Sequence, residues 1–249
     1  MSMQSMFPFE KPLREGIILK RANRFIIDVE LDGEVVKCHC PTTGRIGDIE
    51  TKGIACLVSE SDDPKRKLHY TVEAISCDTL DCPDKNWVGI NQVLSNKLVA
   101  FLLQTHQLDE MISDYSDIRR EVNLGISKLD FLVGNTYIEV KTGLTTLNVV
   151  YGNHVVVKPA KPFSSTERFT KHINELANSL QDHERAILLT VNQYVVTYPK
   201  PRQRSTHYEE VSTAMSRAKE KGLETWNISL RFTPEGVWLH KCENTTNKE

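Results

Sequence analysis

The hydrophobic residues of this chain change their spacing near residues 78–87, and this change limits the available folds more than any other feature. Before it the apolar residues alternate, as in β-strands, and after it they recur about every 3.6 residues, as in helices. The stretch itself is polar, with Pro83 and several aspartates typical of turns. We therefore predict two domains, over residues 1–84 and 85–249.

The first domain has the pattern of a small β-barrel. Apolar alternation marks strands near residues 17–19, 25–31, 35–38 and 54–58, and Asp32-Gly33 is a typical two-residue hairpin turn. About five short strands in about 70 residues fit an OB-fold, which is the fold we expect here. The pattern alone does not distinguish it from an SH3-like barrel.

The second domain has the pattern of an α/β fold. We expect helices over 93–102, 109–120, from Ser164, and over 208–221 up to Gly222, with strands at 129–133, 137–140, 155–157 and 186–191 and a final hairpin turning at 234–236. Glu167, three residues after Ser164, is typical of a capping box. The predicted order is α-β-β-β-α-β-α-β.

Composition excludes several classes of protein. The 31 basic residues nearly balance the 33 acidic ones, so the chain is no bulk polycation and any nucleic-acid contact requires a local basic patch. The apolar run over 98–103 is far shorter than a membrane helix, and residues 1–11 lack the pattern of a secretion signal. We expect no membrane partner and a cytoplasmic location.

The six cysteines do not have the spacing of zinc knuckles. Cys38 and Cys40 alternate with Val36 in an apolar run, where a cysteine usually packs as a small buried side chain.

The residues that most strongly indicate chemistry are Asp130, Glu139 and Lys141. Glu139 and Lys141 are two apart in a predicted strand, so both side chains point to one face of the sheet. If the strands pair across Gly134-Asn135, Asp130 lies near Glu139, and two crowded carboxylates require a compensating charge. Mg²⁺ or Mn²⁺ would provide it, with Asp130 and Glu139 as metal ligands and Lys141 orienting water or phosphate.

A less specific interpretation is also open. Glu139 and Lys141 fit an ordinary surface ion pair, and Asp130 fits a local cap. The order of elements around the three residues nevertheless matches the PD-(D/E)xK nuclease core. Glu121, expected at the end of the preceding helix, stands where that superfamily often has a further catalytic or metal-side acid, although a solvated helix end is an equal alternative.

Over residues 19–241 the chain resembles the sugar fermentation stimulation protein A family. The residues that carry the resemblance are Arg24, Phe25, Asp28, Val29, His39, Pro41, Thr43, Gly44, Lys65, Arg66, Lys67, Asn91, Asn96, Glu121, Val122, Gly125, Ser127, Asp130, Phe131, Glu139, Val140, Lys141, Thr166, Glu167, Arg168, His172, Leu176, Tyr208, Ala218 and Gly222. The resemblance implies an N-terminal OB-fold, a nuclease-like α/β domain, DNA binding of low sequence specificity and a regulatory link to sugar fermentation genes.

The chain departs from the family pattern at a few positions. Thr42, Leu124 and Lys128 are mild replacements, whereas Lys161–Ser165 replaces a segment that normally carries a carboxylate near the site. Asp130, Glu139 and Lys141 are intact.

The sequence has three basic clusters, which are residues 65–67 with His69, residues 158–171, and residues 200–204. The expected nucleic-acid contacts come from the first two: Lys65, Arg66 and Lys67, and Arg168, Lys171 and His172 on the predicted helix. For His172 a hydrogen-bonded structural role is the default alternative. Clustered cations of this kind bind phosphates and read little sequence. Tyr70, Phe25 and Trp87 are candidates for stacking on bases, and for Phe25 and Trp87 a core position is the favoured interpretation.

We accordingly expect a DNA-binding protein of low sequence specificity, acting on double-stranded DNA. The family resemblance adds a regulatory role in maltose-type sugar metabolism, for which a transcription factor is an expected partner. One alternative is an active Mg²⁺-dependent endonuclease on a restricted substrate, such as a branched, single-stranded or RNA-containing duplex. Another is an interaction module whose barrel binds a protein or a saccharide.

Overall fold

The alternating apolar residues of the N-terminal part close into the expected five-stranded barrel. The computed structural model describes residues 5–125, 127–159, 166–201 and 205–247. The barrel strands are β2 (Arg14–Asn23), β3 (Ile26–Leu31), β4 (Glu34–His39), β5 (Ala55–Glu60) and β6 (Tyr70–Ser76). Neighbours pair antiparallel in the order β4-β3-β2-β5-β6, and parallel pairing of β4 with β6 closes the barrel.

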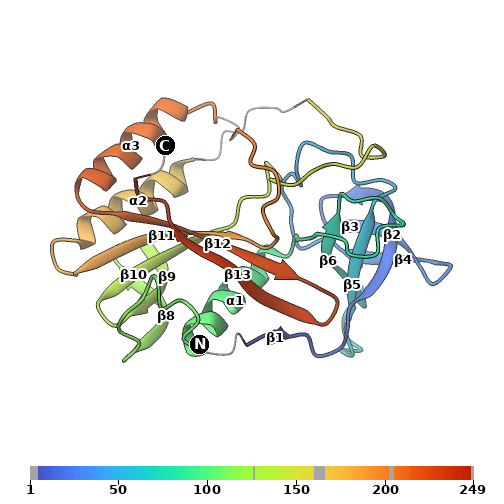
Figure 1. The fold of residues 1–249 in the computed structure, drawn as a ribbon, viewed down its shortest axis with the longest axis horizontal. Coiled ribbons are helices and arrows are strands. Elements are labelled where there is room, and N and C mark those ends of the chain that lie inside the picture. Colours follow the sequence, from blue (N-terminus) through green and yellow to red (C-terminus); the bar gives the residue numbers. More distant parts are fainter. Residues whose placement is uncertain (1–4, 126, 160–165, 202–204, 248–249) are drawn as a thin grey trace.

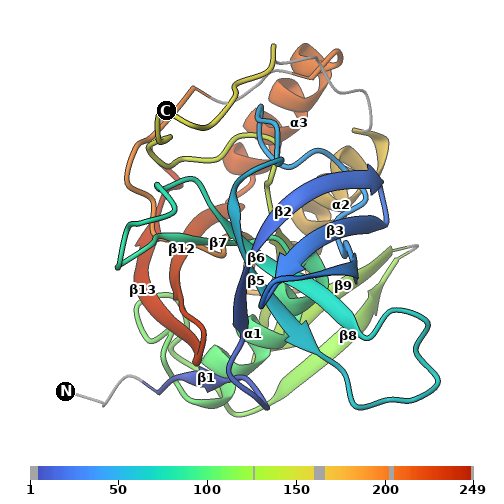
Figure 2. The ribbon, with the colours of Figure 1, turned by 90° about the vertical axis from the view of Figure 1, so that its right-hand side faces the viewer.

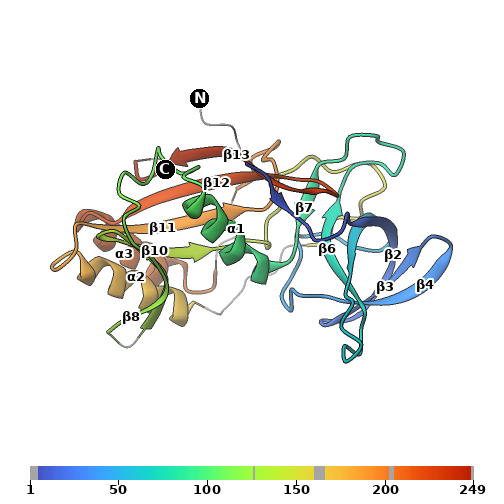
Figure 3. The same cartoon turned by 90° about the horizontal axis from the view of Figure 1, so that it is seen from below.

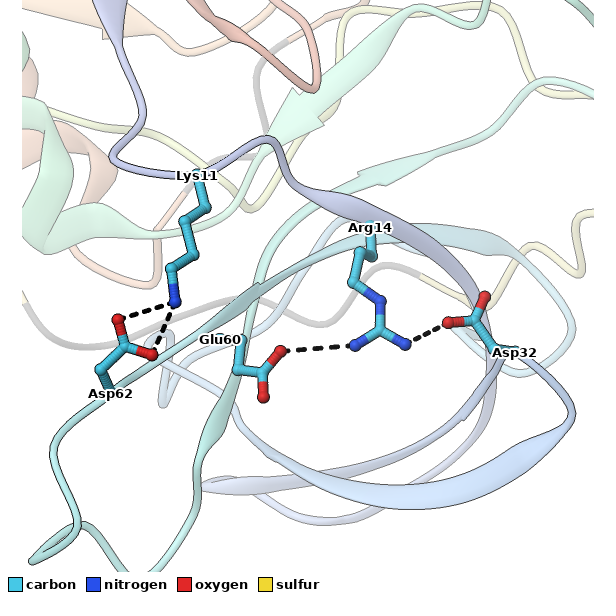
Figure 4. Close-up of polar contacts among 5 residues, drawn as sticks. All are labelled: Lys11, Arg14, Asp32, Glu60 and Asp62. Carbon is cyan, nitrogen blue, oxygen red and sulfur yellow. Dashed lines mark hydrogen bonds and ion pairs between the residues drawn. The ribbon is translucent and has the colours of Figure 1, made fainter.

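A tight turn and a buried apolar core account for the barrel, while its surface carries exposed ion pairs. Asp32 and Gly33, with φ of 51° and 83°, form the predicted turn between β3 and β4. Cys38 and Cys40 are fully buried among its apolar residues, as predicted. The polar contacts on the outer wall are exposed ion pairs: Lys11 with Asp62 at 2.6 Å, and Arg14 with Glu60 at 3.4 Å and with Asp32 (Figure 4). Because exposed pairs contribute little, the apolar core holds the barrel together.

One short strand joins the barrel to the rest of the molecule. β7 (Trp87–Gly89) pairs with β6 of the barrel on one side and with β12 (Glu224–Phe232) on the other, so one sheet runs through both halves (Figure 2). Its side chains alternate between two cores, because Trp87 packs with the α/β half and Val88 packs inside the barrel.

The second half is a mixed sheet with helices on both faces. Its elements are α1 (Gln92–Gln104), β8 (Ile118–Leu124), β9 (Ser127–Val133), β10 (Thr136–Lys141), α2 (Glu167–Ser179), β11 (Arg185–Asn192), α3 (Tyr208–Glu220), β12 and β13 (Gly236–Asn244), with β1 (Phe7–Pro8) added beside β13. The sheet order is β12-β11-β10-β9-β8, and β10, β11 and β12 are parallel. α1 covers one face, and α2 and α3 cover the other (Figure 3).

The predicted helix over 109–120 is wrong. Residues 109–117 form turns, and residues 118–124 form β8, which pairs with β9. Leu108, Met111 and Ile112 are buried at spacings that also occur on a helix face, which explains the error.

The predicted strand at 155–157 is also wrong. This segment leaves the sheet and reaches the barrel, where Val157 forms one isolated bridge with Ile49. Val156 and Val157 are each 56% exposed, so their apolar side chains are not those of a buried strand. The third strand between the two helices is β8, and not residues 155–157. The predicted order of elements is therefore observed, although with a different strand in it.

The remaining elements agree with the predictions. Gly134, with φ of 53°, turns β9 into β10, and Gly222, with φ of 104°, follows α3. The predicted start at Ser164 and the departure over Lys161–Ser165 lie outside the described residues, and α2 as described begins at Glu167. Among the described residues, no helix is long and apolar enough to cross a membrane.

Candidate functional site

Two neighbouring strands stop pairing where the predicted carboxylates stand. β9 and β10 pair from Val133 and Thr136 to Phe131 and Ile138. Beyond that point the side chain of Asp130 bonds to β10, because its Oδ2 accepts a hydrogen bond from the Val140 backbone N–H at 2.8 Å. Where β9 and β10 stop pairing, the Asp130 carboxylate therefore takes the place of a backbone carbonyl as the hydrogen-bond acceptor for β10.

Glu139 occupies the centre of this region. It is 2% exposed, and its Oε1 contacts both Lys141 Nζ and His172 Nδ1. Its other oxygen, Oε2, is buried and has no hydrogen-bond partner among the described residues. We call Asp130, Glu139, Lys141 and His172 the carboxylate site. The sequence prediction that Glu139 and Lys141 share one face is confirmed.

The two carboxyl groups influence each other. Burial raises the pKa of Asp130, and the charge of Glu139 raises it further, while hydrogen bonds from Val140 and Asn96 act in the opposite direction. The Asn96 Nδ2 group donates to Asp130 Oδ1 at 2.6 Å. The site thus concentrates negative charge that the surrounding protein only partly compensates.

The donor set suits a hard divalent cation. Asp130 and Glu139 supply carboxylate oxygens, and the buried Oε2 of Glu139 lacks a partner that a cation would provide. Within the described part of the chain, no group of three or more His, Cys, Asp or Glu side chains is arranged as a metal site. Mg²⁺ is often held by one or two carboxylates with water and phosphate completing its shell, so two carboxylates are sufficient for this class of site.

Glu121 is placed differently from the prediction. It lies within β8 rather than at a helix end, and its carboxylate pairs with Lys128 at 2.6 Å in solvent. This pairing lowers the pKa of Glu121. The register of β8 with β9 puts Glu121 opposite Asp130, and its φ of 54° is rare for a residue with a side chain. Its carboxylate pairs with Lys128, which is not a residue of the carboxylate site.

His172 is buried in α2. It is 5% exposed and contacts Glu139, which fits the structural alternative for this histidine and not the expected phosphate contact. Arg168 and Lys171 are exposed on the same helix, α2. His172 therefore positions a carboxylate, and only Arg168 and Lys171 of this cluster present cations at the surface.

The other predicted basic cluster is on the barrel. Lys65, Arg66 and Lys67 lie in the loop between β5 and β6, where an Arg66 guanidinium nitrogen bonds to Thr71 Oγ1 at 2.9 Å. Figure 1 shows the barrel and α2 on opposite sides of the molecule. The structure does not bring the two predicted clusters together.

Sequence reasoning assigned no role to Asn96. Asn96 is half-buried on α1 and donates to Asp130, but it lies two residues from Leu94 and from Leu98 and so does not belong to their apolar stripe. Its only signal in the sequence was its place among the residues that carry the family resemblance.

Comparison with known proteins gives a consistent family assignment. The family model described as the SfsA N-terminal OB domain matches residues 19–90, and that described as the sugar fermentation stimulation protein RE domain matches residues 93–236. Two similar relatives are both named sugar fermentation stimulation protein homolog. The one from a Cyanothece species is 34% identical over 236 residues, covering 91% of this chain and 92% of the relative. The one from Acaryochloris marina is 35% identical over 235 residues, covering 91% and 90%.

A solved structure has the same fold. It is that of Pyrococcus furiosus SfsA in complex with Ca²⁺, with a TM-score of 0.69 and 20% identity, covering 97% of this chain and 98% of that one. The N-terminal part of this chain, matched over residues 19–90, is thus an OB barrel, as predicted, within a mixed α+β molecule.

Proposed function

Because the chain belongs to the sugar fermentation stimulation protein family, we propose that it binds DNA with low sequence specificity and that a divalent cation at the carboxylate site assists this binding. The observation that carries the proposal is the pair of carboxylates at the strand separation, with Lys141 beside them and an unpartnered buried oxygen on Glu139.

The element order supports this assignment. The series α1-β8-β9-β10-α2-β11, with the acids on β9 and β10 and the lysine two residues after Glu139, resembles the PD-(D/E)xK nuclease core. The Ca²⁺ complex of the Pyrococcus furiosus protein supports a divalent cation, for which Mg²⁺ or Mn²⁺ is our proposal. Such a cation would contribute positive charge toward phosphate oxygens and lower the pKa of bound water.

The protein's own residues have separate tasks in this proposal. Asp130 and Glu139 hold the cation, and His172 holds Glu139 in place from α2. The side chain of Lys141 is 31% exposed, so its ammonium group can reach a phosphate or a water molecule while it contacts Glu139. Because phosphates are the same in every sequence, contacts of this kind give affinity without sequence specificity.

The family name links these relatives to sugar fermentation. We extend that link to this chain as part of the proposal: it regulates genes of sugar metabolism through DNA binding. Transcript measurements after deletion of its gene test this part. Unchanged transcripts of sugar-metabolism genes would contradict it.

A working nuclease is the second candidate, and the position of Lys141 beside Glu139 favours it. Both candidates are tested by titrating the protein against a short DNA duplex at several salt concentrations, with EDTA, Mg²⁺ or Mn²⁺, followed by a denaturing gel. We expect binding that falls steeply with salt, and Asp130→Asn or Glu139→Gln to remove the metal-dependent part, about tenfold or more.

Matched controls are the exposed residues Asp62→Asn and Lys241→Ala, which lie outside the carboxylate site. DNA that stays intact supports a binding protein. Metal-dependent cuts that Lys141→Ala abolishes and Lys241→Ala does not would make the protein a nuclease. Absence of binding, or binding that does not respond to salt, would contradict the proposal.

A further inference from the structure

A basic pocket lies on the barrel, formed by residues outside the carboxylate site, and of its basic residues only Lys158 belongs to a predicted basic cluster. Its volume is about 670 Å³. β2 contributes Lys20 and Arg21, the loop after β4 contributes residues 45–52, and the segment from the other half contributes Lys158 and Pro159. Five basic side chains line it against two carboxylates, those of Asp48 and Glu50. Lys20 pairs with Asp28 at 3.4 Å and Lys158 with Glu50 at 3.9 Å. With Asp28 counted, five cations face three carboxylates, so the pocket still carries a local excess of positive charge in a chain whose net charge is -2.

The pocket wall is held by bonds between the two halves of the molecule. The Gly47 N–H donates to the Leu144 carbonyl at 2.6 Å, and the Lys158 N–H donates to the Asp48 carbonyl at 2.6 Å. The Tyr151 hydroxyl donates to Asp48 Oδ1 at 2.8 Å. Figure 1 shows the yellow segment that carries Tyr151 and Lys158 reaching the barrel. The cations around the pocket thus lie on a framework that is already ordered.

The described hydrogen bonds of Arg21 go to neutral acceptors, so they do not offset its positive charge. Its guanidinium donates to the carbonyls of Gly44 at 3.0 Å and Thr42 at 2.6 Å, which are neutral acceptors. Its Nε is buried and lacks a hydrogen-bond partner among the residues that the structure describes. A half-buried cation bonded to neutral groups favours the approach of an anion.

An exposed aromatic ring stands beside this charge. Phe25, interpreted from sequence as a core residue, is 45% exposed, whereas Trp87 is buried as predicted. The Arg24 guanidinium lies 4.7 Å from the centre of the Phe25 ring, and the Arg24 carbonyl accepts a hydrogen bond from Arg21. Through Arg24, the turn between β2 and β3 thus links an accessible ring to Arg21, which lines the basic pocket.

We infer that the barrel pocket binds single-stranded nucleic acid, with the backbone phosphates among its cations and a base stacked on Phe25. Proteins that bind single strands combine a basic groove with aromatic platforms. A stacking ring requires an unpaired base, because the bases of a duplex already stack on each other, and this favours a single strand over a duplex. The inference does not depend on the proposed function, since it involves neither the carboxylate site nor a metal.

The test is the fluorescence anisotropy of a labelled single-stranded oligonucleotide in EDTA, which keeps the carboxylate site free of metal. Lys52→Ala combined with Lys158→Ala removes two exposed pocket cations. We expect weaker binding and a log–log salt slope smaller by about 1.4, at about 0.7 for each lost phosphate contact. The matched control combines Lys11→Ala with Lys241→Ala, which removes two exposed cations elsewhere.

Phe25 is tested separately because it acts through stacking. Phe25→Leu should weaken single-strand binding about 5- to 150-fold with an unchanged salt slope, and Phe25→Trp should retain it. The inference is overturned if the pocket and control double variants behave alike, if Phe25→Leu binds as the parent does, or if a duplex of the same sequence binds as tightly through the same residues. Because EDTA is present throughout, these results are independent of any failure of metal-assisted duplex binding.

Discussion

At the scale of single residues, Asp130 is a potential metal ligand whose surroundings disfavour its negative charge. It stands in a partly buried position beside the buried Glu139, and both conditions raise its pKa. The folded protein therefore binds a proton at Asp130 more tightly than the unfolded chain does. The associated stability is fully present below the unfolded pKa, near the usual aspartate value of 3.8, and is lost as pH rises through the raised folded pKa. At neutral pH, ionised Asp130 destabilises the fold.

We predict that Asp130→Asn raises the melting temperature at pH 7 in EDTA by roughly 1–3 °C. The amide oxygen still accepts from the Val140 N–H, and the charge that faces Glu139 is removed. The new amide NH2 cannot accept from Asn96 Nδ2, so Asn96 must turn its own oxygen toward it, which limits the gain. Thermal denaturation followed by circular dichroism measures the change. The advantage should shrink as pH falls below the usual range of an aspartate, and the exposed Asp62→Asn should show no comparable gain. A less stable variant at pH 7 would mean that Asp130 contributes to folding.

At the scale of secondary-structure elements, a bidentate ion pair fixes the ends of two parallel strands. Arg185 at the start of β11 donates from Nε and a terminal nitrogen to the two oxygens of Glu224 in β12, at 2.7 and 2.8 Å. The other terminal nitrogen donates to the Met111 carbonyl at 2.8 Å. Burial acts to raise the pKa of Glu224, but hydrogen bonds from Arg185 and Trp226 lower it below its usual value. Arg185 thus connects β11 to β12 through Glu224, and both strands to the turns at residues 109–117 through the Met111 carbonyl.

We expect Arg185→Met to reduce the free energy of unfolding at pH 7 by about 1–3 kcal/mol, since it leaves a partly buried carboxylate without its partner. Adding Glu224→Gln should restore part of the loss. Because the pKa of Glu224 is lowered, its contribution is present above the unfolded pKa and disappears as pH falls through the folded one. Urea denaturation at pH 7 and in acid measures both effects. Equal losses from Arg185→Met and from the exposed Arg231→Met would contradict this role.

The secondary-structure elements also show which features of the fold and of the candidate site could be predicted from the sequence. Turns with a fixed chemistry, such as Asp32-Gly33 and Gly134, and the shared face of Glu139 and Lys141 follow from local rules, and the structure has them. The helix over 109–120 failed because buried residues of an irregular turn can have helical spacing. His172 and Asn96 were missed as partners of the carboxylates because they come from helices distant in sequence. Only the packing of α1 and α2 on the sheet brings them to the site.

At the scale of the whole molecule, β7 makes the two halves one sheet. Trp87 is 6% exposed in the core of the α/β half, and Val88 is fully buried in the barrel. The Gly89 N–H also donates to the Gln193 carbonyl at 2.8 Å. Alternate side chains of one short strand therefore support two cores, which predicts that the halves unfold together.

Trp87→Ala tests this coupling. We expect a loss of about 3–5 kcal/mol, because a large buried side chain is removed, and faster hydrogen exchange in β5 of the barrel as well as in β11. Mass spectrometry of exchanged peptides separates the two halves. Faster exchange in β11 alone, with β5 unchanged, would show that the halves unfold independently.

The central claim is that Asp130 and Glu139 form a divalent-cation site, and titration with Mn²⁺ followed by electron paramagnetic resonance tests it most directly. We predict that the parent protein binds Mn²⁺ and that Asp130→Asn and Glu139→Gln each weaken binding about tenfold or more, while Asp62→Asn binds as the parent does. Circular dichroism of the same samples verifies that the variants are folded. Mn²⁺ binding that is absent from the parent, or unchanged in folded Glu139→Gln, would contradict the claim.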